Sequence, residues 1–365
     1  MLMIIRIFLF WRIGLFLITL LGSYSIAKID NGGIGSIGPG REFNYWASWA
    51  QWDGGHYYHI AKQGYVFLQD YAFFPLYPTL ISFLKRIFFG NLLLTGLLVS
   101  NIAFFFFLLI FYRLIKKKYN QEVAIMTLGT FLTFPTTFFA VSYYSEAVFL
   151  ILTIAVFYFL NEKKFLLAAA ATSLASLTRL VGAALIISVF YSYLASIHMN
   201  FKKITMKLLL VIPAIFGFAI YSLFLFAKLN DPFKFLTSQG TWERSITDPI
   251  STILDYIWAI VTRGSRPIND YFDLFLTLLF LLVLILGIKK ISSSLWLFSI
   301  LVILIPASTG TLTSMPRYLL SSLGVFVILG QYFQARPRLK VLIWSVSLFV
   351  QAILAVRFIN GYWVA

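Results

Sequence analysis

The stretch NLLLTGLLVSNIAFFFFLLIFYRLI, from Asn91 to Ile115, decides the fold class of this chain. A helix rises about 1.5 Å per residue and the hydrocarbon core of a bilayer is about 30 Å thick, so about 20 apolar residues are enough to cross it. The stretch exceeds that length, and a triple lysine, Lys116 to Lys118, follows it directly. It therefore predicts a membrane-spanning helix with a basic flank.

The composition extends this prediction to the whole chain. Of 365 residues, 60% are hydrophobic and only 12% are charged, which is too apolar for a water-soluble domain. Because the sequence has no cysteine, disulfides, thiolate metal sites and cysteine nucleophiles are excluded. The net charge of +16 would suit a nucleic-acid partner, but the basic residues cluster at the ends of apolar runs. We therefore expect a protein of the lipid bilayer and no nucleic-acid partner.

Apolar runs recur along the chain, and about eleven of them predict membrane spans. The fold class expected is an all-α polytopic integral membrane protein, with residues 1–365 forming a single domain. The first run has Arg6 and Arg12 near its start and lacks a convincing cleavage site, which favours an uncleaved anchor. The expected spans are Ile4–Ala27, Asn91–Ile115, Glu122–Ser142, Ala147–Leu160, Phe165–Thr178, Leu180–Ile197, Leu208–Ala227, Tyr271–Ile288, Leu295–Ala307, Tyr318–Tyr332 and Val341–Phe358.

Short basic connections predict the orientation, because lysine and arginine are retained on the cytoplasmic side. The basic connections all fall on the same side of the membrane only if Phe73–Gly90 does not cross it. The two prolines and Lys85-Arg86 of this segment favour a helix that lies in the membrane interface. The N-terminus is then cytoplasmic, and residues 28–90 and 228–270 form two long extracytoplasmic segments. The basic connections are Lys116–Lys118, Lys163–Lys164, Lys202–Lys207, Lys289–Lys290 and Arg336–Lys340.

The first extracytoplasmic segment contains WASWAQWDGGHYYHIAKQGY, Trp46 to Tyr65, with three residues of metal-ligand type. On a helix His59 would lie about 240° round from Asp53, so these two and His56 could share one ion only at an irregular turn. No acidic D-x-D cluster occurs in the outer segments, and we expect no metal and no other cofactor. The nearby GIGSIG, Gly33 to Gly38, matches a dinucleotide-binding pattern, but a membrane span precedes it in place of a strand, which favours a flexible loop.

Three further ionisable residues, Glu146, Arg179 and Arg317, lie at the predicted outer ends of spans. Charges there are unfavourable unless they are paired or face a wet cavity, so each is a functional candidate. The alternative is structural: Glu146 would pair with an arginine to hold the bundle, or the arginines would extend to lipid headgroups.

The stretch WDGGHYYHIAKQGY, Trp52 to Tyr65, resembles the W-D-G-x-x-Y-x-x-I-A-x-x-G-Y signature of the PIG-V-like mannosyltransferases. Leu180 is a departure, because that family usually has proline after the arginine. Further similar stretches follow in order through nearly the whole chain: AFFPLYP at 72–78, YYSEAVFLIL at 143–152, LASLTRLVG at 174–182, SQGTWERSITDP at 238–249, SMPRYLL at 314–320 and FINGYWVA at 358–365.

The resemblance implies a GT-C glycosyltransferase fold, with interfacial helices in the long first outer loop. It also implies a donor in which a sugar, most simply mannose, is carried on polyprenyl phosphate, and transfer with inversion at the extracytoplasmic face. No feature specific to GPI-anchor synthesis is visible, so the acceptor stays open among a glycolipid, a glycan and a protein.

Transfer of a sugar to a hydroxyl requires a base for the acceptor proton and positive groups for the departing phosphate. We expect Asp53 to be the catalytic base, since it is an outer-loop carboxylate set among tryptophans. Arginine stays charged and offers forked donors, so Arg179 and Arg317 are expected at the donor phosphate, with His56 as a third group. The residues expected to contact substrate are Trp52, Gly54, Tyr57, Glu146, Trp242 and Arg244.

Two other function classes compete with an enzyme. A transporter or flippase of lipid-linked saccharides usually shows internal repeats and polar groups near mid-membrane, whereas here no repeat is visible and the polar residues gather toward one face. A membrane scaffold would leave the charges at the ends of the spans without a purpose. The sequence therefore favours a glycosyltransferase.

Overall fold

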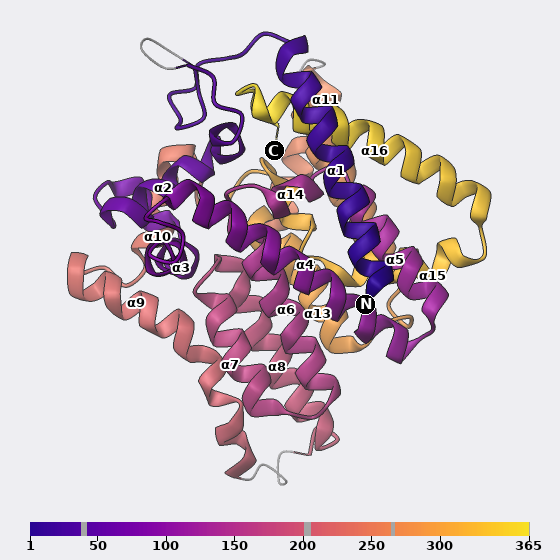
Figure 1. The fold of residues 1–365 in the computed structure, drawn as a ribbon. Helices are drawn as coiled ribbons and strands as arrows, with labels where there is room; N and C mark the ends of the chain where they lie inside the picture. Colours follow the sequence, from indigo (N-terminus) through magenta and orange to yellow (C-terminus); the bar gives the residue numbers. More distant parts are fainter. Residues whose placement is uncertain (38–41, 201–205, 264–266, 365) are drawn as a thin grey trace. The chain divides into compact units, whose positions relative to one another are not determined.

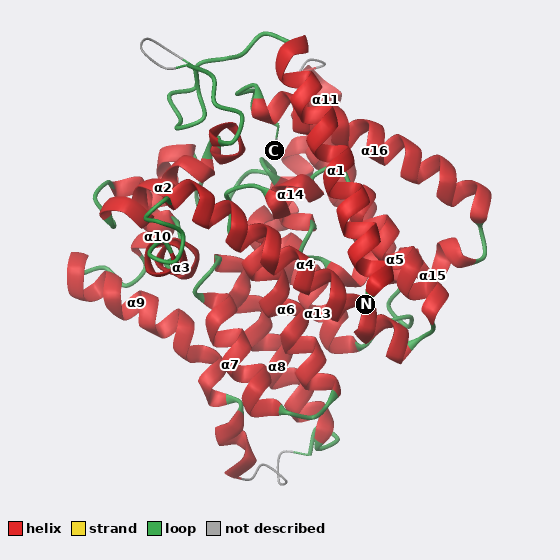
Figure 2. Ribbon diagram, in the orientation of Figure 1, coloured by secondary structure: helices red, strands yellow, loops and turns green. Residues whose placement is uncertain are grey.

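The computed structural model describes residues 1–37, 42–200, 206–263 and 267–364. These residues form helices joined by loops, and no strand occurs among them (Figures 1 and 2). The predicted all-α fold class is therefore confirmed. The chain divides into two compact units that interleave in sequence. Unit 1 comprises Met1–Val66, Tyr77–Val148 and Leu329–Ala365, and unit 2 comprises Phe67–Leu76 and Phe149–Ile328.

Five helical stretches within the described residues are long and apolar enough to cross a bilayer, and six shorter apolar helices accompany them. The chain is thus a multi-pass integral membrane protein, although the predicted number of spans stays a prediction. The five stretches are Leu2–Ser25, Leu92–Lys118, Leu208–Leu229, Ile268–Leu286 and Pro337–Ile359.

Long helices build unit 1, with α1 (Leu2–Ser25) packed against α16 (Pro337–Ile359) and against α4 (Leu92–Lys118). The helix α5 (Gln121–Thr133) contacts α4 and α16. Gln351 on α16 joins three of these elements, because its amide accepts from the indole of Trp11 at 3.0 Å and donates to the carbonyls of Leu132 and Phe134. Gln351 is therefore a buried polar side chain whose hydrogen bonds link α1, α5 and α16.

The expected span Glu122–Ser142 is not one continuous helix. The helix α5 ends at Thr133, because Pro135 restricts the residue before it to an extended conformation, and Phe134 has φ −60° and ψ 137°. A buried 3-10 turn, η3 (Thr137–Val141), follows. The chain then runs through a non-helical segment into α6 (Glu146–Asn161), which begins in unit 1.

Shorter helices complete unit 1: η1 (Ala47–Ala50), α2 (Asp53–Gln63) and α3 (Leu76–Leu84), whose first residue belongs to unit 2. The helix α3 has nine residues, well below the length of a span, as predicted for Phe73–Gly90. Of the GIGSIG stretch, Gly33 to Ile37 form bends and a turn, and Gly38 lies outside the described residues.

Unit 2 is a helical bundle in which α7 (Phe165–Ser176) packs against α8 (Ala183–Ser196) and α9 (Phe216–Leu229). The contact with α9 is close, because a Cβ on Gly217 would overlap the carbonyl of Ser173. The helix α13 (Ser293–Ala307) packs against α8, α11 (Pro249–Arg263), α12 (Ile268–Leu286) and α14 (Met315–Leu319). The other elements are η2 (Leu68–Ala72), η4 (Leu180–Gly182), η6 (Met206–Leu210), η7 (Ile212–Ile215), α10 (Lys234–Thr237), η8 (Ser238–Trp242) and α15 (Leu323–Gln334).

Candidate functional site

The predicted base, Asp53, is the first residue of α2 and is half-buried. His56 lies one turn later on the same helix and is also half-buried. The residues of α2 that are buried, Gly54, Tyr57, Ile60 and Ala61, recur at helical spacing and form the face that packs into unit 1. Asp53 and His56 are thus carried by a helix whose other face is fixed.

Hydroxyl groups fix that buried face. The phenol of Tyr57 hydrogen-bonds Ser145 at 2.8 Å, and its ring lies edge-on to Tyr77 with 5.2 Å between ring centroids. The phenol of Tyr77 pairs with Ser100 at 2.9 Å and donates to the carbonyl of Gly96. The Tyr57 bond attaches α2 to the segment that leads into α6, where Glu146 is the first helical residue and only 3% exposed, and the Tyr77 bonds attach α3 to α4.

Tyr77 stays a neutral phenol in this environment. Burial raises its pKa well above the ordinary value, and the neighbouring Tyr143 and Glu146 raise it further, whereas the bond to Ser100 opposes them. Unit 1 therefore brings together the predicted residues Asp53, His56, Tyr57 and Glu146. Tyr57 is bonded to protein on its hydroxyl, and a contact of its ring with substrate stays a prediction.

Gly54 and Gly55 differ in the space around them. A Cβ on Gly54 would lie 3.2 Å from the carbonyl oxygen of Tyr143 and 3.3 Å from the ring of Tyr144. A Cβ on Gly55 would meet only the carbonyl of Ala50, at 4.0 Å. Gly54 thus permits the close approach of α2 to the segment before Glu146. The predicted contact of Gly54 with substrate stays a prediction.

In unit 2 three arginines converge on one aromatic ring. The guanidinium carbons of Arg179, Arg244 and Arg317 lie 5.1, 5.9 and 5.8 Å from the ring centroid of Tyr318. Arg179 directly precedes η4, Arg317 is a buried residue of α14, and Arg244 follows η8. Sequence reasoning expected Arg179 and Arg317 to act together and placed Arg244 with the substrate contacts. The structure adds Arg244 to the same group and identifies Tyr318 as its centre.

The position of Arg244 is fixed by the connection between α13 and α14. Its guanidinium donates to the hydroxyl of Thr309 at 3.1 Å and to the carbonyl of Thr313 at 2.9 Å. The backbone beside it pairs with the same connection, because Ser245 N–H donates to Thr309 O and Thr247 N–H donates to Ser308 O. This part of the second outer segment is therefore held by main-chain and side-chain bonds.

Sequence reasoning missed Asp273, which is 3% exposed on α12. It interacts electrostatically with Arg244 and Asp270 and accepts a hydrogen bond from the backbone N–H of Ser314, the residue before α14. A signal was present, because an acidic residue inside an apolar span is a functional candidate in its own right. Asp273 therefore belongs to the group around Arg244.

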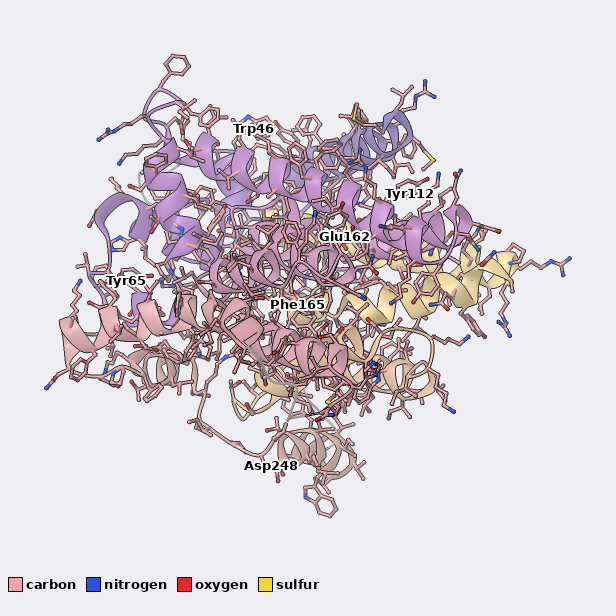
Figure 3. All side chains as sticks on the ribbon, turned by 90° about the horizontal axis from the view of Figure 1, so that it is seen from below. Trp46, Tyr65, Tyr112, Glu162, Phe165 and Asp248 are labelled. Carbon is pink, nitrogen blue, oxygen red and sulfur yellow. The ribbon has the colours of Figure 1, made fainter. Side chains whose placement is uncertain are left out.

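Two remaining residues of the second outer segment have clear local roles. Trp242 is 40% exposed, and its ring lies edge-on to Phe73 with 5.9 Å between centroids. Asp248, labelled in Figure 3, caps α11, since its carboxylate accepts from the N–H of Ser251 at 2.7 Å. Among the described residues, no group of three or more His, Cys, Asp or Glu has an arrangement that could hold a metal ion.

The two neighbouring glycines provide a matched test of the packing of α2. Alanine favours a helix over glycine by up to about 1 kcal/mol, so Gly55→Ala should raise the melting temperature or leave it unchanged. At Gly54 the crowding by Tyr143 and Tyr144 should outweigh that gain, with a net loss on the order of 1 kcal/mol. Thermal unfolding of both variants in the same detergent measures the difference. Equal melting temperatures would mean that α2 does not pack closely against the segment before Glu146.

Comparisons with known proteins identify the family and the fold of this chain. A family model described as Mannosyltransferase (PIG-V) matches residues 39–234, more than half of the chain. The crystal structure of ArnT from Cupriavidus metallidurans bound to undecaprenyl phosphate is similar in fold, with a TM-score of 0.52 at 13% identity. The similarity covers 94% of this chain and 63% of that one, so the chain spans less than two thirds of the length of ArnT. No curated protein matches the sequence. The chain has the GT-C fold and belongs to the PIG-V mannosyltransferase family of membrane glycosyltransferases.

Proposed function

We propose that this glycosyltransferase moves mannose from a polyprenyl-phosphate donor to a hydroxyl of a glycolipid, glycan or protein, at the extracytoplasmic face of the membrane. The observation that carries the proposal is the convergence of Arg179, Arg244 and Arg317 on Tyr318. Guanidinium groups stay charged and offer forked donors to phosphate oxygens, so a group of three suits an anionic substrate. The undecaprenyl phosphate bound to the structurally similar ArnT supports a lipid-borne phosphate as that anion.

The chemistry assigned to unit 2 is stabilisation of the leaving phosphate. Guanidinium groups stay charged and donate in a forked geometry that matches phosphate oxygens. The ring of Tyr318 lies within cation–π range of all three and keeps them gathered. As the bond between the anomeric carbon and the phosphate oxygen breaks, the electron pair goes to that oxygen and the arginines stabilise its charge.

The chemistry assigned to unit 1 is proton removal from the acceptor. The carboxylate of Asp53 takes the proton of the acceptor hydroxyl while its oxygen forms the new bond to the anomeric carbon. A single displacement of this kind inverts the anomeric centre. His56 is assigned to the donor phosphate, and Glu146 and Trp242 are assigned to the sugar and the acceptor.

The membrane supplies much of the donor's binding energy. Each buried CH₂ of an isoprenoid tail contributes about 0.8 kcal/mol, so the bilayer retains the donor and the protein need only orient its head. The orientation with the N-terminus in the cytoplasm rests on the basic connections, of which Lys116, Lys117 and Lys118 form the last turn of α4. It places the outer segments, and with them Asp53, on the extracytoplasmic side.

Purified protein incubated with a panel of polyprenyl-phosphate sugars tests the proposal directly. Mass spectrometry of the products should show a hexose added to an acceptor when polyprenyl-phosphate mannose is the donor, and no addition from nucleotide sugars. Transfer from a nucleotide sugar alone would contradict the lipid-linked donor.

Replacing the proposed base separates chemistry from binding. Asp53→Asn keeps the size of the side chain but removes the carboxylate, so turnover should fall by about 10³-fold or more while donor affinity changes less than about threefold. The matched control is Asp248→Asn, because asparagine caps a helix as well as aspartate does and α11 should be unaffected. Turnover of Asp53→Asn within about tenfold of the native enzyme would remove Asp53 from this role.

The arginine group makes a prediction about donor affinity. Arg244→Ala and Arg317→Ala should each weaken binding of a polyprenyl phosphate by about 10- to 100-fold, since a charge-assisted hydrogen bond contributes about 1.5–3 kcal/mol. Arg336→Ala is the matched control, because Arg336 also lies over a tyrosine, with 3.9 Å from its guanidinium carbon to the ring centroid of Tyr332, but in unit 1 and exposed. Unchanged affinity in the Arg244 and Arg317 variants would make the cluster structural.

The proposed reaction uses no metal ion. Incubation with EDTA should therefore leave the rate of transfer within about twofold of the untreated enzyme. Loss of transfer that Mg²⁺ or Mn²⁺ restores would contradict the metal-independent mechanism.

A further inference from the structure

Trp52, the residue directly before Asp53, has a backbone conformation that tryptophan rarely adopts. Its φ is 54° and its ψ is −120°, the values of the first central residue of a type II′ turn, where glycine normally stands. The turn is closed by a hydrogen bond of 3.0 Å from Gly54 N–H to Gln51 O. A bulky residue in this region is strained, and such strain persists only where the surroundings hold it.

The surroundings of Trp52 include the last described residues, Asn360–Val364, which we call the C-terminal arm. The indole N–H of Trp52 donates to the carbonyl of Tyr362 at 3.3 Å. The ring of Trp363 lies edge-on to that of Trp52, with 5.0 Å between centroids and an interplanar angle of 86°. Both polar and aromatic contacts of the Trp52 side chain are therefore made to the arm.

The arm is itself anchored to unit 1 on its other side. Asn360, which is 1% exposed, donates to the carbonyl of Gly22 on α1 and accepts through its backbone oxygen from Ile29 N–H at 2.9 Å. Gly361 O accepts from the amide of Asn31 at 3.2 Å. Gly361 has φ 90°, and a Cβ there would overlap the carbonyl of Ile29, so the approach of the arm requires glycine.

The residue on the other side of the turn is held independently. Gln51 is 1% exposed, its backbone carbonyl accepts from the phenol of Tyr144 at 2.9 Å, and its side chain bonds Gly35 and Asn31. The turn is thus fixed at Gln51 by the body of unit 1 and at Trp52 by the arm. The arm is therefore the attachment of the Trp52 side chain, while the Trp52 carbonyl accepts from Gly55 N–H at 2.9 Å within α2.

We propose that the C-terminal arm is the positioning element of Asp53: by holding Trp52 in a conformation suited to glycine, it sets the direction in which the Asp53 carboxylate leaves the start of α2. This inference rests on the proposed function of Asp53 as the base. Trp52 and Trp363 are then positioning residues, because they act through Asp53 and not on the reacting atoms.

The comparison of Trp52→Gly with Trp52→Ala tests the inference. Both variants remove the indole, but only glycine adopts φ 54° without steric strain. Trp52→Ala should lower kcat by about 10- to 100-fold with the donor KM within about threefold, and Trp52→Gly should recover at least about fivefold of that loss. If Trp52 acted instead by stacking on the sugar, the two variants would be equally impaired.

Trp363 provides a second, independent test through a double-mutant cycle. Trp363→Ala should lower kcat in the native background, whereas in the Trp52→Gly background it should change kcat by less than about twofold, because the arm then has no side chain to hold. The matched control is Trp258→Ala, since Trp258 is 68% exposed on α11 and should leave kcat unchanged. Additive losses from Trp363→Ala and Trp52→Gly would overturn the inference.

Two further measurements make the outcomes unambiguous. Size-exclusion chromatography and thermal unfolding measure whether each variant is folded. If Trp52→Ala is unfolded, the double-mutant cycle of Trp52→Gly with Trp363→Ala decides the inference by itself. Asp53→Asn is assayed in parallel. Normal turnover of Asp53→Asn would remove the base and the inference together, whereas its loss of turnover combined with equal Trp52→Ala and Trp52→Gly would overturn the inference alone.

Discussion

The hydrocarbon core of a bilayer offers no hydrogen-bond partner to a peptide group, and the architecture of this chain depends on that constraint. It explains why the described residues form helices, and it makes every interruption of a helix conspicuous. Three interruptions lie at candidate residues: the segment Phe134–Ser145 before Glu146, the segment Leu177–Arg179, and the connection Ser308–Ser314 before Arg317.

Each interruption satisfies its backbone with partners from elsewhere in its own unit. In the first, Tyr143 N–H donates to the carbonyl of Trp49 at 3.0 Å. In the second, Leu177 O accepts from Leu76 N–H at 2.8 Å. In the third, the carbonyls between α13 and α14 accept hydrogen bonds from the stretch that contains Arg244. The segments predicted to lie outside the membrane thus supply backbone partners at all three of these breaks.

The sequence predicted what depends on composition and local pattern. Membrane helices and the short helix near Phe73–Gly90 follow from apolar length, and charges at the ends of spans identify Arg179 and Arg317 as candidates. Pro135 indicates the end of α5, but the apolar residues on both sides of it favoured one continuous span in the sequence analysis. The family resemblance identified the fold, which composition alone leaves open among many helical membrane proteins.

Contacts between distant parts of the chain were beyond this reasoning. Nothing in a local pattern shows that Arg244 joins Arg179 and Arg317, or that a tyrosine ring gathers them. The conformation of Trp52 is unexpected for its residue type, and it depends on a carbonyl 310 residues later in the sequence. Tertiary contacts hold this strained conformation, so it can be seen only in the folded chain.

The charges around Tyr318 suit the change in charge that the proposed reaction requires. A polyprenyl-phosphate sugar is a phosphodiester with one negative charge, whereas the departing monoester carries close to two at neutral pH. Arg244 is held by Thr309 and Thr313, while Arg179 and Arg317 bring two more positive charges to the same ring. A cluster of this charge interacts more strongly with the product phosphate than with the donor, and an interaction that strengthens along the reaction lowers the barrier.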